Sequence, residues 1–85
     1  MAKRIVPTSP PPRNGPIDPK LLAQFIRSKR TNLGLTIHEA ALLCNVSLST
    51  ISKIETASGS VMFDKVLEVC DKLGIKLYVQ IGDDV

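Results

Sequence analysis

A very short connection between two helix signals is the feature that most constrains this fold. Thr36 and Glu39 form a T-x-x-E capping box at the start of TIHEAALLCN, and Ser47 is a good cap for the segment that follows. Only Asn45 and Val46 separate the two segments. The sequence therefore predicts two short helices joined by a tight turn.

Two further helical patterns flank this pair. In the first, over residues 18–34, Asp18 can cap the helix, Pro19 suits its first position and Gly34 can end it. Its apolar residues recur at helical intervals, namely Leu22, Phe25, Ile26 and Leu33. The second pattern, FDKVLEVCDKLG, stops at Gly74 and predicts a fourth helix. Its expected inward residues are Phe63, Val66, Leu67, Cys70 and Leu73.

The period of the pattern changes after Gly74. In IKLYVQIG, residues 75–82, apolar residues alternate with others as in a strand with one buried face. The expected dimerisation residues are Ile75, Leu77, Tyr78, Val79 and Ile81. A lone strand leaves its backbone groups unpaired, and KRIV, residues 3–6, is the other candidate strand. The pattern favours pairing with the same strand of a second chain, as a twofold dimer with a shared ribbon; an intramolecular pair and a frayed tail are the alternatives.

The N-terminal segment is rich in proline. VPTSPPPRNGP, residues 6–16, cannot form a helix or a central strand, because proline removes backbone donors and fixes backbone angles. Residues 1–17 are therefore predicted to be a flexible extended arm that carries Lys3, Arg4 and Arg13. A disordered tail without function is the alternative.

Charge is unevenly distributed along the 85 residues, although the net charge is only +3. Residues 1–55 carry eight Lys and Arg against three acidic residues, whereas residues 56–85 carry three against five. A basic first part suits contact with a polyanion. No apolar run is long enough to span a membrane, and no signal-peptide pattern opens the chain. We expect Cys44 and Cys70 to be buried and reduced in a cytoplasmic protein, with a disulfide as the alternative.

The segment NVSLSTISKIE has helical spacing but many hydroxyl side chains, which are mediocre in helices because they compete for local backbone partners. If Ile51 and Ile54 point to the core, a compact polar face points outward. Its residues are Ser49, Thr50, Ser52 and Lys53, with Ser47 and Leu48 at the amino-terminal tip. Such a face suits the second helix of a helix-turn-helix, which enters the major groove of DNA. A solvated Ser-rich face is the alternative.

The stretch IRSKRTNLGLTIHEAALLCNVSLSTISKIE, residues 26–55, resembles the Cro/repressor-type (Xre-like) helix-turn-helix family. The matching pattern is R-x-x-R-x-x-x-G-L-T, then an E-A-A step, then V-S-x-S-T-I-S-x-I-E. By this resemblance, the residues that contact bases are Ser47, Leu48, Ser49 and Ser52, and those at phosphates or the groove edge are Thr50 and Lys53. Candidate backbone-contacting residues are Arg27 and Lys29, and Thr36 belongs to the same DNA-binding set.

The resemblance also separates structural residues from DNA-contacting ones. Arg30 and Glu55 match a pair that forms an internal ion pair in some relatives, so we expect a structural role for Arg30. The family usually has Gln at the first position of the second helix, and this chain has Ile37. The contact made by that Gln is therefore lost here, and the neighbouring His38 is more simply explained as solvated.

The end of the chain narrows the resemblance. A four-helix core followed by LGIKLYVQIG is similar to HipB-type antitoxins, in which the terminal strand pairs between subunits. This implies a homodimer that binds double-stranded operator DNA, represses its own operon and binds a HipA-type serine/threonine kinase toxin, alone or with a further small subunit. A stand-alone Xre-type regulator is the alternative, and an adaptor that uses the acidic second part to bind a protein is a third hypothesis.

The expected fold class is mainly α, a four-to-five-helix Xre-like domain with one C-terminal β-strand paired across a dimer. The expected division is an arm over residues 1–17, a helix-turn-helix DNA-binding domain over 18–74 and a dimerisation strand and tail over 75–85. No cofactor, metal ligands or catalytic residues are expected, because there is one histidine and no paired-carboxylate or metal-ligand pattern. We expect a cytoplasmic, nucleoid-associated protein.

Overall fold

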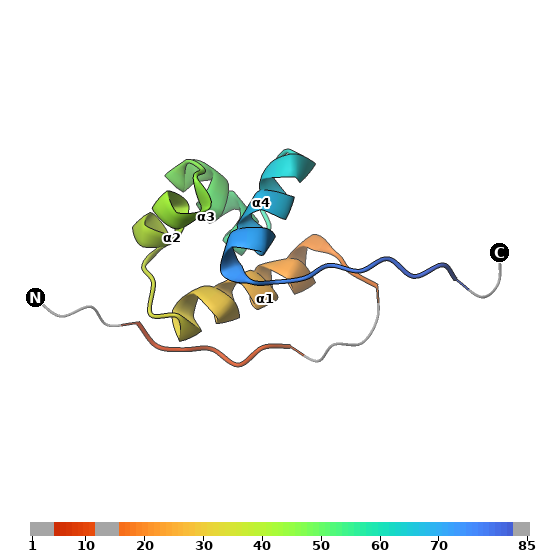
Figure 1. Cartoon of the computed structure of the whole chain (residues 1–85), viewed down its shortest axis with the longest axis horizontal. Coiled ribbons are helices and arrows are strands. Elements are labelled where there is room, and N and C mark those ends of the chain that lie inside the picture. Colours follow the sequence, from red (N-terminus) through yellow and green to blue (C-terminus); the bar gives the residue numbers. More distant parts are fainter. Residues whose placement is uncertain (1–4, 12–15, 83–85) are drawn as a thin grey trace, which may run out of the picture.

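Four helices form the ordered domain in the part of the chain that the structure describes. The structure is a computed structural model that describes residues 5–11 and 16–82. The helices are α1 (Pro19–Asn32), α2 (Ile37–Cys44), α3 (Leu48–Thr56) and α4 (Phe63–Leu73). In Figure 1, α1 lies along one side of the domain and the other three helices pack above it, with α1 in contact with α3 and α4. The predicted mainly α domain is confirmed.

The predicted helix starts are confirmed by their caps. The Asp18 carboxylate accepts a hydrogen bond from the Leu21 N–H at 2.8 Å. Thr36 and Glu39 make both bonds of the capping box, at 3.1 and 2.8 Å. The hydroxyl of Ser47 caps α3 in the same way. Each cap satisfies N–H groups that helix geometry leaves without a partner in the first turn.

The turn between α2 and α3 depends on the conformation of Asn45. Its φ of 57° lies in the left-handed region, which Asn adopts more readily than most residues because of its short polar side chain. The Val46 N–H then donates to the Ala41 carbonyl at 3.1 Å and closes the end of α2. Ser47, the N-cap of α3, follows at once, so α2 and α3 are held close together by a connection of three residues.

The hydrophobic core lies between the four helices. Its buried residues are Ile26, Ala40, Ala41, Cys44, Ile51, Ile54, Val69, Cys70 and Leu73. The prediction for α4 was wrong at two positions, because Phe63 and Leu67 are exposed, by 69% and 42%. The buried stripe of α4 instead includes Val69, and Phe63 lies in the first turn, where α4 extends past the other helices (Figure 1). In α1, Leu33 is exposed as well, because it follows the last helical turn.

The two cysteines are free and buried, as expected. Burial raises the pKa of the Cys44 thiol, and it raises the pKa of the Cys70 thiol to about 11. The Cys44 thiol donates a weak hydrogen bond to the Val69 carbonyl at 3.9 Å, which joins α2 to α4. Both side chains are therefore neutral packing residues, with little thiolate for chemical reaction.

The described part of the N-terminal arm, residues 5–11, runs antiparallel to α1 (Figure 1). The Thr8 N–H donates to the Thr31 hydroxyl at 3.1 Å, and the Thr8 carbonyl accepts from the Ser28 hydroxyl at 2.7 Å and from the Asn32 amide at 3.0 Å. We call Ser28, Thr31 and Asn32 the α1 clasp. The basic residues predicted for the arm, Lys3, Arg4 and Arg13, lie outside the described residues.

The C-terminal segment does not form the predicted strand within one chain. The described residues contain no strand, and residues 75–82 leave α4 in an extended path that runs away from the domain (Figure 1). The Ile75 N–H donates to the Cys70 carbonyl, and the Ile75 side chain is half-buried against the core. No neighbouring backbone pairs with the later residues, because the arm, including Ile5 and Val6 of the other candidate strand, lies along α1 instead. Pairing between two chains remains a prediction.

Candidate nucleic-acid interface

The outer face of α3 has the orientation that the sequence predicts. Ile51 and Ile54 are buried in the core, while Ser49, Ser52 and Lys53 are exposed. Their side chains make no hydrogen bond or ion pair with other described residues. The hydrogen-bonding groups of these three side chains are therefore available to a ligand outside the domain.

The tip of α3 is more constrained than the resemblance implies. The Ser47 hydroxyl accepts a hydrogen bond from the Thr50 N–H at 3.1 Å, and the two side-chain hydroxyls lie 2.9 Å apart. One acceptor position of the Ser47 hydroxyl is thus already used to cap α3, and Thr50 is half-buried beside it. Leu48 is partly exposed between Ser47 and the outer face. Ser47 and Thr50 therefore stabilise the start of α3, whereas the Leu48 side chain remains accessible to a ligand at the tip.

Two further hydroxyl groups, which the sequence did not assign to the site, lie at the end of α3 and just after it. The Thr56 hydroxyl donates to the Ser52 carbonyl at 2.8 Å and lies 2.7 Å from the Ser58 hydroxyl. The stem of Lys53 lies along Gly59, where an added Cβ would be 3.5 Å from the Lys53 Cδ. In the sequence, the indication that these hydroxyls adjoin the outer face of α3 was the run of small residues after Glu55. Such a run is also typical of a simple loop.

The internal ion pair between α1 and α3 is confirmed. The Arg30 guanidinium donates from Nε to the Glu55 carboxylate at 2.5 Å and from Nη2 at 2.9 Å, and both side chains are buried. The remaining Nη1 donates to the Leu35 carbonyl at 2.8 Å. The bidentate pair joins α1 to α3, and the bond to Leu35 adds the connection to α2. The guanidinium of Arg30 is therefore engaged by groups within the fold.

The other two basic candidates, Arg27 and Lys29, lie on different sides of α1. Two residues along a helix are about 200° apart around its axis. Arg27 is exposed one turn before Arg30, whereas Lys29 lies beside Gly74, with its Cε 3.7 Å from the position of an added Cβ. Lys29 therefore points to the end of α4, and the structure does not bring it to the outer face of α3.

The residues at the start of α2 are engaged in the fold. Thr36 accepts and donates within its capping box with Glu39 and is half-buried. Ile37, which replaces the expected Gln, packs against the core, and His38 is exposed. Thr36 thus determines where α2 begins, and its side chain is engaged within the fold.

Two other kinds of site are absent from the described residues. No three His, Cys, Asp or Glu side chains in these residues are close enough to hold a metal ion. No helix in the same part of the chain is both long and apolar enough to cross a membrane.

A four-helix domain in which a three-residue connection joins α2 to a hydroxyl-rich α3 is, by its geometry, a helix-turn-helix domain. Comparison with known families agrees, because the profile of a helix-turn-helix family matches residues 26–79, which is more than half of the chain. The chain belongs to this family of Xre-like helix-turn-helix proteins, which indicates a DNA-binding transcriptional regulator. No curated protein matches the chain.

Proposed function

We propose that the chain binds a specific double-stranded DNA site as a transcriptional repressor, with α3 in the major groove. The observation that carries this proposal is the outer face of α3, where Ser49, Ser52 and Lys53 are exposed and their side chains have no partner among the described residues. Small hydroxyls let a helix approach the base edges closely, and they can both donate and accept hydrogen bonds there.

The proposed contacts follow from the exposure of each side chain. Leu48, Ser49 and Ser52 face the base edges, with Leu48 suited to an apolar contact such as a thymine methyl group. Lys53 and Arg27 are exposed basic residues that suit phosphate oxygens. Ser47, Thr50 and Thr36 hold the helix ends in place and contribute at most through their remaining hydrogen-bonding positions.

We further propose that the regulator acts as a homodimer, because a twofold pair of α3 helices reads two half-sites of an operator. Support comes from the C-terminal segment, in which Leu77, Tyr78, Val79 and Ile81 are exposed although their pattern is that of a half-buried strand. Pairing of the two segments would satisfy their backbone groups.

Two biological roles fit such a regulator. The similarity of the C-terminal segment to HipB-type antitoxins supports an autoregulating antitoxin that binds a HipA-type kinase toxin. The family match, which ends at residue 79, supports a stand-alone regulator equally well. Co-purification of the chain with the proteins encoded beside it separates the two roles: a kinase in the complex supports the antitoxin, and recovery of the chain without one supports the stand-alone regulator.

A gel-shift titration against the DNA upstream of its own gene tests the DNA-binding proposal directly. Phosphate contacts predict that the logarithm of the binding constant falls with the logarithm of salt concentration, with a slope of about −0.9 for each neutralised phosphate. Competition with unrelated DNA measures specificity. A flat salt dependence, or equal binding to unrelated DNA, contradicts the proposal.

A further inference from the structure

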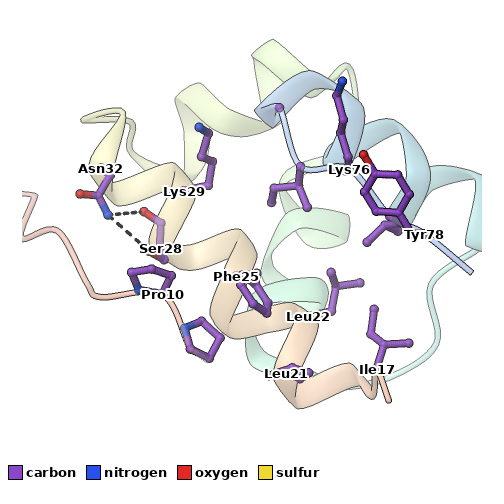
Figure 2. Close-up of a pocket in the computed structure, with 14 residues that line it drawn as sticks. Pro10, Ile17, Leu21, Leu22, Phe25, Ser28, Lys29, Asn32, Lys76 and Tyr78 are labelled. Carbon is purple, nitrogen blue, oxygen red and sulfur yellow. Dashed lines mark hydrogen bonds between the residues drawn. The ribbon is translucent and has the colours of Figure 1, made fainter. Parts of the chain in front are cut away.

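An open apolar groove runs between α1 and the first residues of the C-terminal segment. Its volume is about 900 Å³, and Figure 2 shows Ile17, Leu21 and Phe25 along one wall. Tyr78 lies on the opposite wall, and Pro10 of the arm bounds the groove near the α1 clasp. Ile17 is 58% exposed, whereas Leu21 and Phe25 are half-buried, so the described chain leaves the Ile17 end of this wall uncovered.

The C-terminal segment carries apolar side chains that likewise have no cover. In an extended chain, alternate residues share a face, so Ile75, Val79 and Ile81 lie on one side. Ile75 is half-buried against the core, but Val79 and Ile81 are 96% and 77% exposed, where the segment has left the domain (Figure 1). We call residues 79–82 the tail.

We propose that the tail of a second copy of this chain lies in the groove, with Val79 and Ile81 against Ile17 and Leu21. This inference rests on the proposed homodimer and adds the surface that receives each tail. The groove is not filled by the chain's own tail, because Val79 and Ile81 are exposed and neither lines it. A twofold axis would place each tail in the other copy's groove, so that two equal contacts close the dimer.

The charges around the groove favour this occupant over an unrelated apolar peptide. Lys29 and Lys76 are both exposed and both line the groove. In the sequence, Asp83 and Asp84 directly follow the tail. A tail that enters the groove therefore brings two carboxylates with it to a rim that carries two ammonium groups, and such complementarity selects partner and register.

This arrangement would assign Lys29 a role that the sequence did not predict. Its stem lies beside Gly74, where the absence of a side chain leaves room for it. Lys29 would then contribute to DNA binding only indirectly, through the dimer that sets the distance between the two α3 helices. An exchanged tail also differs from a shared ribbon alone, because it buries side chains against α1 in addition to pairing backbones.

Disulfide trapping between two differently tagged chains tests the inference. One chain carries Leu21→Cys and the other carries Ile81→Cys; they are mixed, oxidised and separated without reductant. The native Cys44 and Cys70 do not compete, because they are buried. A mixed disulfide between the two tagged chains is expected. The matched control pairs Ile81→Cys with Leu42→Cys on α2, which is 82% exposed, and no mixed disulfide is expected there.

A second measurement uses charge in place of a cross-link. Ile17→Asp in the groove and Val79→Asp in the tail should each raise the dimer dissociation constant about tenfold or more, because a carboxylate is then desolvated in an apolar contact. Both positions are exposed within one chain, so the fold should be retained. Leu42→Asp is the control, with no expected effect on mass or dissociation constant in analytical ultracentrifugation.

The outcomes distinguish three proposals: that the groove receives the tail, that the chain is a homodimer, and that it binds DNA. Absence of the Leu21–Ile81 bridge in a chain that is dimeric by mass, or an Ile17→Asp variant that dimerises normally, overturns the groove and leaves tail–tail pairing. A monomeric wild-type chain overturns both the groove and the dimer. Failure to bind DNA with the bridge intact overturns only the proposed function.

Discussion

α1 and α3 both carry hydroxyl side chains, yet the two helices use them in opposite ways. In α1, Ser28 and Thr31 are buried and bind the backbone of Thr8, which lies 20 and 23 positions earlier in the chain. In α3, Ser49 and Ser52 are exposed, and their hydroxyls bind nothing in the described chain. The same residue type therefore serves the fold in one helix and is free for a ligand in the other.

The difference shows that a hydroxyl side chain on a helix suggests ligand binding only when it has few hydrogen-bond partners within the protein itself. The Thr31 hydroxyl donates to the Arg27 carbonyl at 2.9 Å and accepts from the Thr8 N–H at 3.1 Å, so its donor and one of its acceptor positions are used. The Thr56 hydroxyl donates to the Ser52 carbonyl and lies beside the Ser58 hydroxyl, so its donor is likewise used within the fold. By contrast, Ser49 and Ser52 in the middle of the outer α3 surface keep their side-chain donors and acceptors unused within the described residues, on a helix that the Arg30–Glu55 pair joins to α1.

The largest effect is expected where the two helices are joined. Glu55→Ala should lower the free energy of unfolding by about 3–5 kcal/mol, because it leaves the buried Arg30 guanidinium without its carboxylate. Urea denaturation followed by circular dichroism measures the change. The double variant Arg30→Met with Glu55→Leu should recover most of the loss. A loss below about 1 kcal/mol for Glu55→Ala would mean that solvent reaches the pair.

A charge on the free face of α3 should affect binding and not folding. Ser49→Glu should weaken operator affinity by about 100-fold or more, because it sets a carboxylate against phosphate and base oxygens. The free energy of unfolding should stay within about 0.5 kcal/mol, since Ser49 is exposed.

Gln24→Glu is the matched control for this charge, because it adds the same charge at an exposed position of α1. Gel shifts of the two variants with the same operator measure the difference. Equal weakening by both would mean that net charge, and not the α3 face, accounts for the loss. An unfolded Ser49→Glu variant would show that this face packs against the protein.

Removing the α1 clasp should affect stability and leave the α3 surface intact. Ser28→Ala combined with Asn32→Ala removes both donors to the Thr8 carbonyl and should cost about 1–2 kcal/mol of unfolding free energy. Thermal unfolding measures the cost. In a chain that lacks residues 1–11, the same pair of substitutions should cost much less. An undiminished cost there would show that the two side chains stabilise α1 itself.

The parts of this fold that could be predicted from sequence are those fixed by local chemistry. Asp18, the box of Thr36 and Glu39, and Ser47 determine helix starts within three residues of themselves, so their pattern is visible in the sequence. The orientation of α3 was predictable too, because Ile51 and Ile54 alone fix which face is inward.

The rest depends on contacts between distant segments. Phe63 and Val69 both fit the period of α4, and only the position of the other helices decides that Val69 is buried. Lys29 could not be placed without the end of α4, and the clasp depends on Thr8, which no periodicity connects to α1. Alternating apolar residues predict a strand over residues 75–82, but one chain alone does not show whether it forms, because a strand requires a neighbouring strand.

The smallest effect is expected from a single hydroxyl on the free face of α3, and it tests the comparison most closely. Ser52→Ala should change the free energy of unfolding by less than about 0.5 kcal/mol, since its side chain has no partner in the part of the chain that the structure describes. It should weaken operator binding about two- to tenfold, which corresponds to one lost hydrogen bond. Thr56→Ala, one turn further on, removes a hydroxyl already occupied by the Ser52 carbonyl, and its effect on affinity should be smaller. Stronger weakening of operator binding by Thr56→Ala than by Ser52→Ala would contradict this interpretation. Unused hydrogen-bonding positions would then not identify the DNA interface, and the hydroxyls at the end of α3 would belong to it.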